Sequence, residues 1–190
     1  TWYIGGILES LLVFLAVLVA FWTLLIQRQH NRKQMLPVIH TYYSHYYEGD
    51  EKNEHFELKL FNDGHGVAIL KSASVKLPDG EIVTFGNSIE LSNFVEEQIP
   101  SATQQSTSLP FAVRGNSQES IYKVSIPKSD QSKFSELRFT FVAESIYGDV
   151  AVADETGFSF KSNPVDAYFD KMTSFMSRQL LRLTKSQSAN

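Results

Sequence analysis

Residues 4–26, IGGILESLLVFLAVLVAFWTLLI, are almost entirely apolar and decide how the rest of the chain is organised. At about 1.5 Å of rise per residue, a helix of this length extends roughly 35 Å, which is enough to cross a bilayer core of about 30 Å. Glu9 is the only charged residue in the first 26 positions. The stretch therefore predicts a transmembrane helix, which we assign to residues 1–26.

Basic residues follow this apolar stretch at once and none precedes it: Arg28, Arg32 and Lys33 lie just beyond its end. The positive-inside rule then places residue 27 onwards in the cytoplasm and the short N-terminus outside. The alternative is a signal peptide, which needs a positively charged start, a shorter apolar core and a small-residue cleavage site. None of these is present, so we expect a single-pass protein of a cell membrane.

One side of the predicted transmembrane helix is lined by small and polar residues. At about 100° per residue, one stripe contains Gly5, Glu9, Leu12, Ala16, Ala20 and Thr23. Small residues let helices approach closely, and an ionisable residue inside a span usually faces protein or water. The stripe predicts a helix–helix interface with an integral membrane protein or with copies of the chain. Alternatively, Glu9 reaches water at the outer interface and the alanines are there by chance.

Composition limits what the remaining roughly 160 residues can do, which is the size of one ordinary domain. The whole chain of 190 residues has a net charge of −4, and a mildly acidic domain argues against nucleic acid as a partner. Because the chain has no cysteine, thiolate metal sites, thiol nucleophiles and disulfides are excluded.

The chain changes its hydrophobic period after Pro37, which cannot continue a helix interior. Residues 27–35 are predicted to form a short polar extension of the helix, and we assign 27–36 as the juxtamembrane linker. Residues 37–162 contain eight or nine short apolar or alternating runs separated by turn residues. In HFELKLF, for example, Phe56, Leu58 and Leu60 lie on one face. This spacing predicts a mainly β domain, an antiparallel β-sandwich.

Two turns between these runs carry glycine: Asn62-Asp63-Gly64 and Pro78-Asp79-Gly80. We expect each glycine to supply the positive φ that a tight turn needs. Residues 88–100, SIELSNFVEEQIP, stay ambiguous, because they fit either a helical turn or a crossover between strands.

The segment from Leu58 to Leu70, LKLFNDGHGVAIL, contains a hydrophobic strand followed by N-x-G-x-G-x-A. It resembles a pattern in uncharacterised bacterial single-span membrane proteins that carry an immunoglobulin-like β-sandwich. The resemblance implies that sandwich and a bacterial cell membrane setting, and it implies no catalytic residue. A phosphate-binding glycine loop would need a third glycine and a following helix, whereas Gly66 is followed by a strand-like run.

A second helix is predicted at the C-terminus, over residues 163–185, with residues 186–190 as a tail. Asn163 is placed to cap it, and Pro164 and Asp166 suit its first turn. One face is apolar, with Val165, Tyr168, Phe169, Met172, Phe175, Met176, Leu180 and Leu183, and the opposite side carries Lys171, Arg178, Arg182 and Lys185.

Three uses of this amphipathic helix are open. Its contact residues Phe169, Met172, Phe175, Met176, Leu180 and Leu183 could pack on the sandwich or on the same helix of another copy. The helix could instead lie on membrane lipid at the anionic inner leaflet, where basic residues are attracted. It could also dock into a groove of a partner protein.

No residue pattern in the chain indicates catalysis, and we predict no catalytic residue, no metal and no cofactor. Of the five histidines, none forms a metal pair at helical spacing, and neither a nucleophile elbow nor a zinc-protease motif is present. The carboxylates Glu144, Asp149, Asp154 and Glu155 surround a turn at Gly148. They suit either a calcium site or a solvated loop.

Taken together, the sequence predicts a non-enzymatic, membrane-anchored accessory or scaffold subunit of a larger membrane assembly, with one or several kinds of subunit. The alternative is a membrane-tethered sensor or effector. Its sandwich would bind a ligand or a foreign protein, as in bacterial defence or stress responses.

Overall fold

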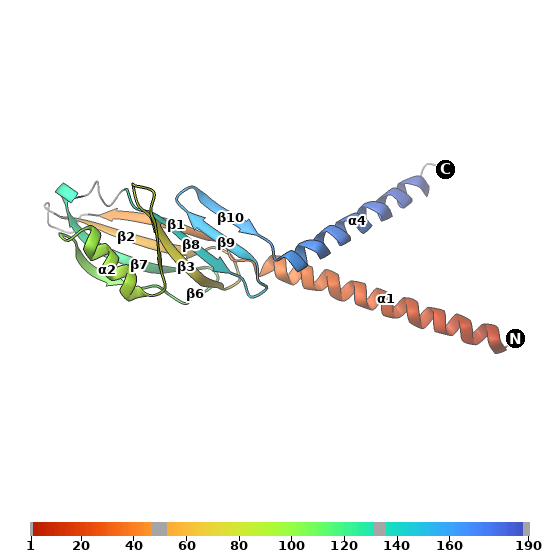
Figure 1. Ribbon diagram of the computed structural model, residues 1–190. Coiled ribbons are helices and arrows are strands. Elements are labelled where there is room, and N and C mark those ends of the chain that lie inside the picture. Colours follow the sequence, from red (N-terminus) through yellow and green to blue (C-terminus); the bar gives the residue numbers. More distant parts are fainter. Residues whose placement is uncertain (1, 47–52, 131–135, 188–190) are drawn as a thin grey trace. The chain divides into compact units, whose positions relative to one another are not determined.

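The computed structural model describes residues 2–46, 53–130 and 136–187, except the side chains at 2–5, 104–105, 173, 176–177 and 179–187. The chain divides into two units. One contains two long helices, α1 (Trp2–Gln34) and α4 (Pro164–Gln187), and the other is a β domain formed by Met35–Pro164 (Figure 1).

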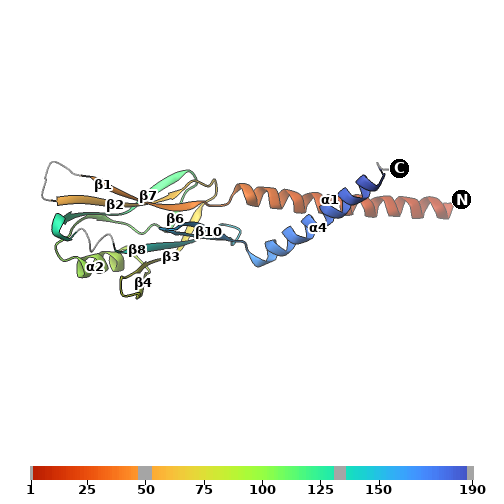
Figure 2. The ribbon, with the colours of Figure 1, turned by 90° about the horizontal axis from the view of Figure 1, so that it is seen from above.

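The β domain consists of two antiparallel sheets, which appear as separate layers in Figure 2. The first sheet contains, in spatial order, β1 (Ile39–Tyr46), β2 (Asn53–Asn62), β7 (Ser117–Pro127) and β5 (Thr103–Thr107). The second contains β10 (Gly157–Lys161), β9 (Val150–Asp154), β8 (Arg138–Glu144), β3 (Ala68–Lys76) and β4 (Ile82–Phe85), with β6 (Ala112–Val113) also paired to β3. The predicted mainly β, antiparallel architecture is therefore confirmed.

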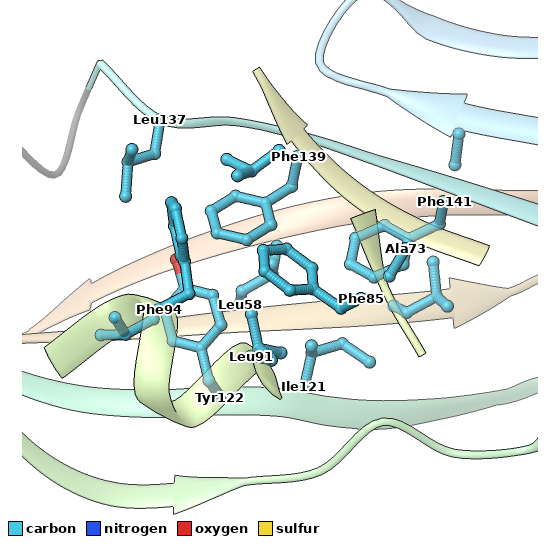
Figure 3. Close-up of a cluster of buried hydrophobic side chains, with 14 of the residues drawn as sticks. Leu58, Ala73, Phe85, Leu91, Phe94, Ile121, Tyr122, Leu137, Phe139 and Phe141 are labelled. Carbon is cyan, nitrogen blue, oxygen red and sulfur yellow. The ribbon is translucent and has the colours of Figure 1, made fainter. Parts of the chain in front are cut away.

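A single hydrophobic core lies between the sheets. Phe56, Leu58 and Leu60 on β2 are at most 1% exposed, so the predicted inward face of this strand is confirmed. The second sheet contributes Phe139 and Phe141 of β8 to the same core (Figure 3). Alternation with period two places these side chains on one face of each strand, and their burial drives the sheets together.

Helix α2 (Ser88–Gln98) settles the ambiguous segment after β4 in favour of a helix. Asn87 caps it, because its side chain accepts a hydrogen bond from Glu90 N at 3.0 Å, while Glu90 Oε2 accepts one from Gly86 N at 2.6 Å. These bonds form a variant of the capping box, in which the glutamate accepts from the N–H of the residue before the N-cap. The helix buries Leu91 and Phe94 and contacts β4 and β5, the edge strands of the two sheets.

The two glycine turns differ from the expectation in one respect. Gly80 has a φ of +93°, as predicted for a tight turn. Gly64, in contrast, does not have a positive φ, so that prediction was wrong. A Cβ on Gly64 would overlap the backbone carbonyl oxygen of Leu36, and one on Gly66 would overlap that of Met35. Close approach of the segment that follows α1 is therefore what requires glycine here.

Boundaries and strand number also differ from the expectation. Helix α1 continues to Gln34, which agrees with a polar extension of the helix that stops before Pro37, although residues 27–36 were predicted as a segment of their own. Helix α4 continues to Gln187, so the first two residues of the predicted tail are helical. Within the described residues, the domain has ten strands in place of eight or nine, because β5, which reads TQQST, was missed.

Two tyrosines in or against the core, Tyr43 of β1 and Tyr122 of β7, should make the stability of the domain depend on alkaline pH. Burial raises the pKa of Tyr43 to about 12 and raises that of Tyr122 well above its usual value. Since the folded state favours the neutral phenol, the stabilisation is complete below about pH 10 and is lost as the pH rises towards 12. We expect the free energy of unfolding to fall by roughly 3 kcal/mol between about pH 9 and pH 11.

Urea unfolding at a series of pH values, followed by circular dichroism, measures this effect. The variant Tyr43→Phe should lose about half of the dependence, whereas Tyr42→Phe, at a neighbouring exposed position, should leave the curve unchanged. Equal stability at both pH values would contradict the prediction.

Candidate interaction site at the apolar helix

Helix α1 presents apolar side chains to its surroundings over most of its length. Residues Gly6–Gln34 form a helix that is long and apolar enough to cross a membrane, and no part of its most apolar window is buried. Large side chains on different faces are exposed, including Leu8 at 59%, Val13 at 63% and Phe21 at 58%. Helix length and apolarity alone do not distinguish a transmembrane helix from a signal sequence near an N-terminus. A helix that is apolar all round requires an apolar environment, and the described part of the chain does not supply one.

The predicted interface stripe is exposed on this helix. The exposed side chains are those of Glu9, Leu12, Ala16, Ala20 and Thr23, while the burial of Gly5 lies outside the description. Thr23 Oγ1 donates a hydrogen bond to Val19 O at 2.8 Å. This local bond satisfies the hydroxyl of Thr23 within its own helix. Glu9 and the two alanines therefore remain as the stripe's candidates for recognition of another helix.

Four charged residues join the end of α1 to the start of α4, within the two-helix unit. Arg28 Nη2 lies 3.3 Å from Asp166 Oδ1, and Arg32 Nε lies 3.7 Å from Asp166 Oδ2. Arg32 Nη1 also lies 3.4 Å from Asp170 Oδ2. Arg32 is 4% exposed and Asp166 is 6% exposed, so these two residues are shielded from water, whereas the side chain of Arg28 is 58% exposed. We call Arg28, Arg32, Asp166 and Asp170 the arginine–aspartate cluster.

The sequence assigned other roles to these residues, namely topology for Arg28 and Arg32 and a first-turn charge for Asp166. Each pair has a spacing of four residues, which places both members on one side of a helix. Two arginines and two aspartates at the same spacing were the available signal for a contact between the two helices. The spacing alone did not show that they meet, because Arg32 and Asp170 are 138 positions apart in the chain.

Asn62 of the N-x-G-x-G-x-A motif fixes the segment that follows α1. The side chain is fully buried. Its Oδ1 accepts hydrogen bonds from Val38 N and Gly64 N, both at 3.1 Å. Its Nδ2 donates to Gly66 O at 2.7 Å and to Val113 O at 3.1 Å. Four bonds from one amide hold together the start of β1, the crossover from β2 to β3, and β6.

Asp149 has the corresponding role in the segment that precedes α4. It is fully buried and accepts a hydrogen bond from Asn163 N at 2.9 Å. The side chain of Asn163 in turn donates to Tyr147 O at 3.1 Å. Ser145 Oγ accepts hydrogen bonds from Tyr147 N and Asp149 N, both at 3.1 Å. Buried polar side chains thus fix the backbone of the domain at both of its connections to the helices.

The carboxylates near Gly148 do not converge on a common point. Asp149 accepts from Asn163, Glu144 pairs with Lys71 at 2.8 Å, and Glu155 pairs with Arg138. The oxygen Oδ1 of Asp154 accepts a hydrogen bond from Thr156 N at 2.8 Å. Among the described residues, no group of three or more histidine or acidic side chains is arranged to hold a metal ion. The calcium alternative therefore has no support in the geometry.

The apolar side of α4 is exposed where it is described. Val165, Tyr168 and Phe175 are 60%, 68% and 60% exposed. Phe169 and Met172 are half-buried. The side chains of the other three predicted contact residues lie outside the description, namely Met176, Leu180 and Leu183. Like α1, this helix carries apolar surface that the described part of the chain does not cover.

Comparison with known proteins adds no relative to this description. No known protein family matches the chain, and no curated protein matches it either.

Proposed function

We propose that the chain is a non-enzymatic, single-pass membrane protein and serves as an accessory or scaffold subunit of a larger membrane assembly. Helix α1 is its transmembrane helix, with the N-terminus outside, and the β domain lies in the cytoplasm of a bacterial cell. The β domain is an immunoglobulin-like sandwich, consistent with its two antiparallel sheets and with the crossover from β2 to β3 between them.

The observation that carries this proposal is the exposed apolar surface of α1, which ends at a cluster of basic residues. Arg28 lies two residues and Arg32 six residues beyond Ile26, the end of the apolar stretch. Basic residues at the end of a span favour the cytoplasmic side. The arginine–aspartate cluster attaches α4 at this end, so a second helix with exposed apolar residues begins there.

The assembly forms through the stripe on α1. Ala16 and Ala20 are one turn apart and permit a close approach of two helix backbones. Glu9 gains a hydrogen-bonding partner in another helix, since burying its side chain in lipid alone is costly. The neighbour is an integral membrane protein or a second copy of this chain.

Replacing Glu9 by leucine should weaken this assembly by about tenfold, because an interhelical polar contact contributes on the order of 1–2 kcal/mol. The experiment is purification of the full chain in a mild detergent, with the protein mass of the complex measured by light scattering over a range of dilutions. Ser10→Leu is the matched control, because it removes a polar side chain that lies outside the stripe and bonds within its own helix.

A wild-type chain that is strictly monomeric and free of any co-purifying membrane protein would contradict the accessory-subunit proposal. Equal dissociation of Glu9→Leu and of Ser10→Leu would remove Glu9 from the interface.

A further inference from the structure

Helix α4 carries its charges on two separate sides, with apolar residues between them. Asp166 and Asp170 lie on one side and contact the arginines of α1. Lys171 and Arg178 lie on another side, where both are exposed. Along the helix, Lys171 follows Tyr168 by three residues and Arg178 follows Phe175 by three, so each basic residue is next to an exposed aromatic ring.

The negative charges of α4 are neutralised by the arginines of α1, whereas its two described positive charges, Lys171 and Arg178, have no acidic partner among the described residues. Both aspartates pair with Arg28 or Arg32, as described above. Neither Lys171 nor Arg178 forms an ion pair with any described residue, and Arg178 Nε donates only to the backbone oxygen of Ser174 at 3.2 Å. The sequence continues the basic side with Arg182 and Lys185. Helix α4 therefore presents unneutralised positive charge beside apolar surface.

The β domain has the opposite balance. Residues 35–163 contain 18 acidic and ten basic side chains. An anionic surface would repel this domain and attract α4, so the charge distribution favours a partner that meets α4 and not the sheets.

The arginine–aspartate cluster also fixes the depth at which α4 begins. Arg28 and Arg32 lie about 3 Å and 9 Å beyond Ile26 along the helix axis, at about 1.5 Å per residue. If α1 spans a bilayer, as the proposed function requires, Arg28 is at the level of the lipid headgroups, which extend roughly 5–8 Å beyond the hydrocarbon core, and Arg32 is at the outer edge of this layer. Asp166, in contact with both arginines, places the first turn of α4 at the same level.

We propose that α4 lies on the cytoplasmic leaflet of the same membrane and binds anionic lipid. Its apolar side enters the boundary between headgroups and acyl chains, and Lys171, Arg178, Arg182 and Lys185 contact lipid phosphates. This arrangement combines an apolar face with aromatic side chains and a basic flank, as in helices that lie in the membrane interface. Each basic residue adds to the attraction of an anionic surface.

The chain has no native cysteine, so a single spin label can be placed at any chosen position. The full chain is reconstituted in vesicles of phosphatidylcholine, with or without about one third phosphatidylglycerol, and oxygen and a water-soluble nickel complex are used to measure label depth. Met172→Cys reports on the apolar side, and Ser174→Cys, about 200° away around the helix, is the matched control. Tyr168→Cys provides a second reporter at an exposed apolar position.

The measured quantity is the ratio of oxygen accessibility to nickel accessibility at each label. With anionic lipid, this ratio at Met172 and Tyr168 should be at least about threefold higher than at Ser174, because the first two lie in the membrane interface and the third in water. Replacing Lys171, Arg178, Arg182 and Lys185 by glutamine should abolish this difference. Labels that stay as water-accessible as Ser174→Cys would overturn the proposal. A second result would also overturn it: labels shielded from both oxygen and the nickel complex, with spin–spin broadening that does not depend on lipid charge. A second copy of the chain would then cover α4.

A label at Leu15→Cys separates this proposal from the function on which it rests. Oxygen accessibility at Leu15 with water accessibility at Met172 would overturn only the placement of α4. Water accessibility at Leu15 would overturn the membrane span itself, and the placement of α4 with it.

Discussion

Replacing Asn62 by alanine should lower the free energy of unfolding of the β domain by roughly 3–5 kcal/mol. Alanine removes four hydrogen bonds and leaves the backbone groups of Val38, Gly64, Gly66 and Val113 without this partner. Each buried polar group left unsatisfied costs about 1–3 kcal/mol, and partial relaxation or water entry recovers some of that sum. The measurement is urea unfolding of the full chain in detergent, followed by near-ultraviolet circular dichroism.

Asn93 provides the matched control for this variant, because it is an exposed asparagine on α2. Asn93→Ala should change the free energy of unfolding by less than about 0.5 kcal/mol. If Asn62→Ala were no more destabilising than Asn93→Ala, the motif would not fix the segment after α1, and the physical reading of N-x-G-x-G-x-A would be wrong.

Replacing Arg32 by glutamine should release the first turns of α4 from α1. The variant removes the guanidinium from two carboxylates and leaves Asp166, which is 6% exposed, with Arg28 as its remaining arginine in the cluster. Because Asp166 keeps Arg28 as a partner, the cost is that of lost contacts between charged groups, about 1.5–3 kcal/mol. Amide hydrogen exchange at residues 165–172 should therefore accelerate by roughly ten- to a hundredfold.

The control for Arg32→Gln is Lys33→Gln, which removes an exposed neighbouring charge and should leave the exchange of α4 unchanged. Asp166→Asn combined with Arg32→Gln should cost less than the sum of the two single variants, because the residues share one interaction. Equal exchange in Arg32→Gln and in Lys33→Gln would show that the cluster does not hold α4.

The parts of the fold that were predictable are those with a strong local pattern. The apolar run of α1, the alternation of β2 and the apolar periodicity of α4 each repeat over several turns or residue pairs. Such a pattern predicts the type of element and its apolar residues without knowledge of what packs against it.

One element, β5, was missed, and for another, α2, the sequence supports two alternatives. Strand β5 reads TQQST and has no apolar alternation, and it exists because β7 offers it an edge. Helix α2 is short, yet its capping box, Asn87 followed three residues later by Glu90, was readable in the sequence. Strand β5 therefore depends on pairing with β7, which the sequence does not show. The capping residues of α2 would have favoured a helix over a crossover between strands.

The candidate site was predictable only as separate pieces. The stripe on α1 and the amphipathic pattern of α4 are visible in the sequence, but their attachment through Arg32, Asp166 and Asp170 depends on the fold. The requirement for glycine at positions 64 and 66 likewise arises from close contact with the backbone of residues 35–38. Contacts between distant segments carry no local pattern, which is why both were missed.

Cysteine labelling in intact cells tests the central claim, a transmembrane α1 with the β domain in the cytoplasm, most directly. The reagent is a membrane-impermeant maleimide, applied to Thr1→Cys and to Asn93→Cys in the chain, which has no native cysteine. The proposal predicts that Thr1→Cys reacts in intact cells and that Asn93→Cys reacts only after lysis. Reaction of Asn93→Cys in intact cells would contradict it.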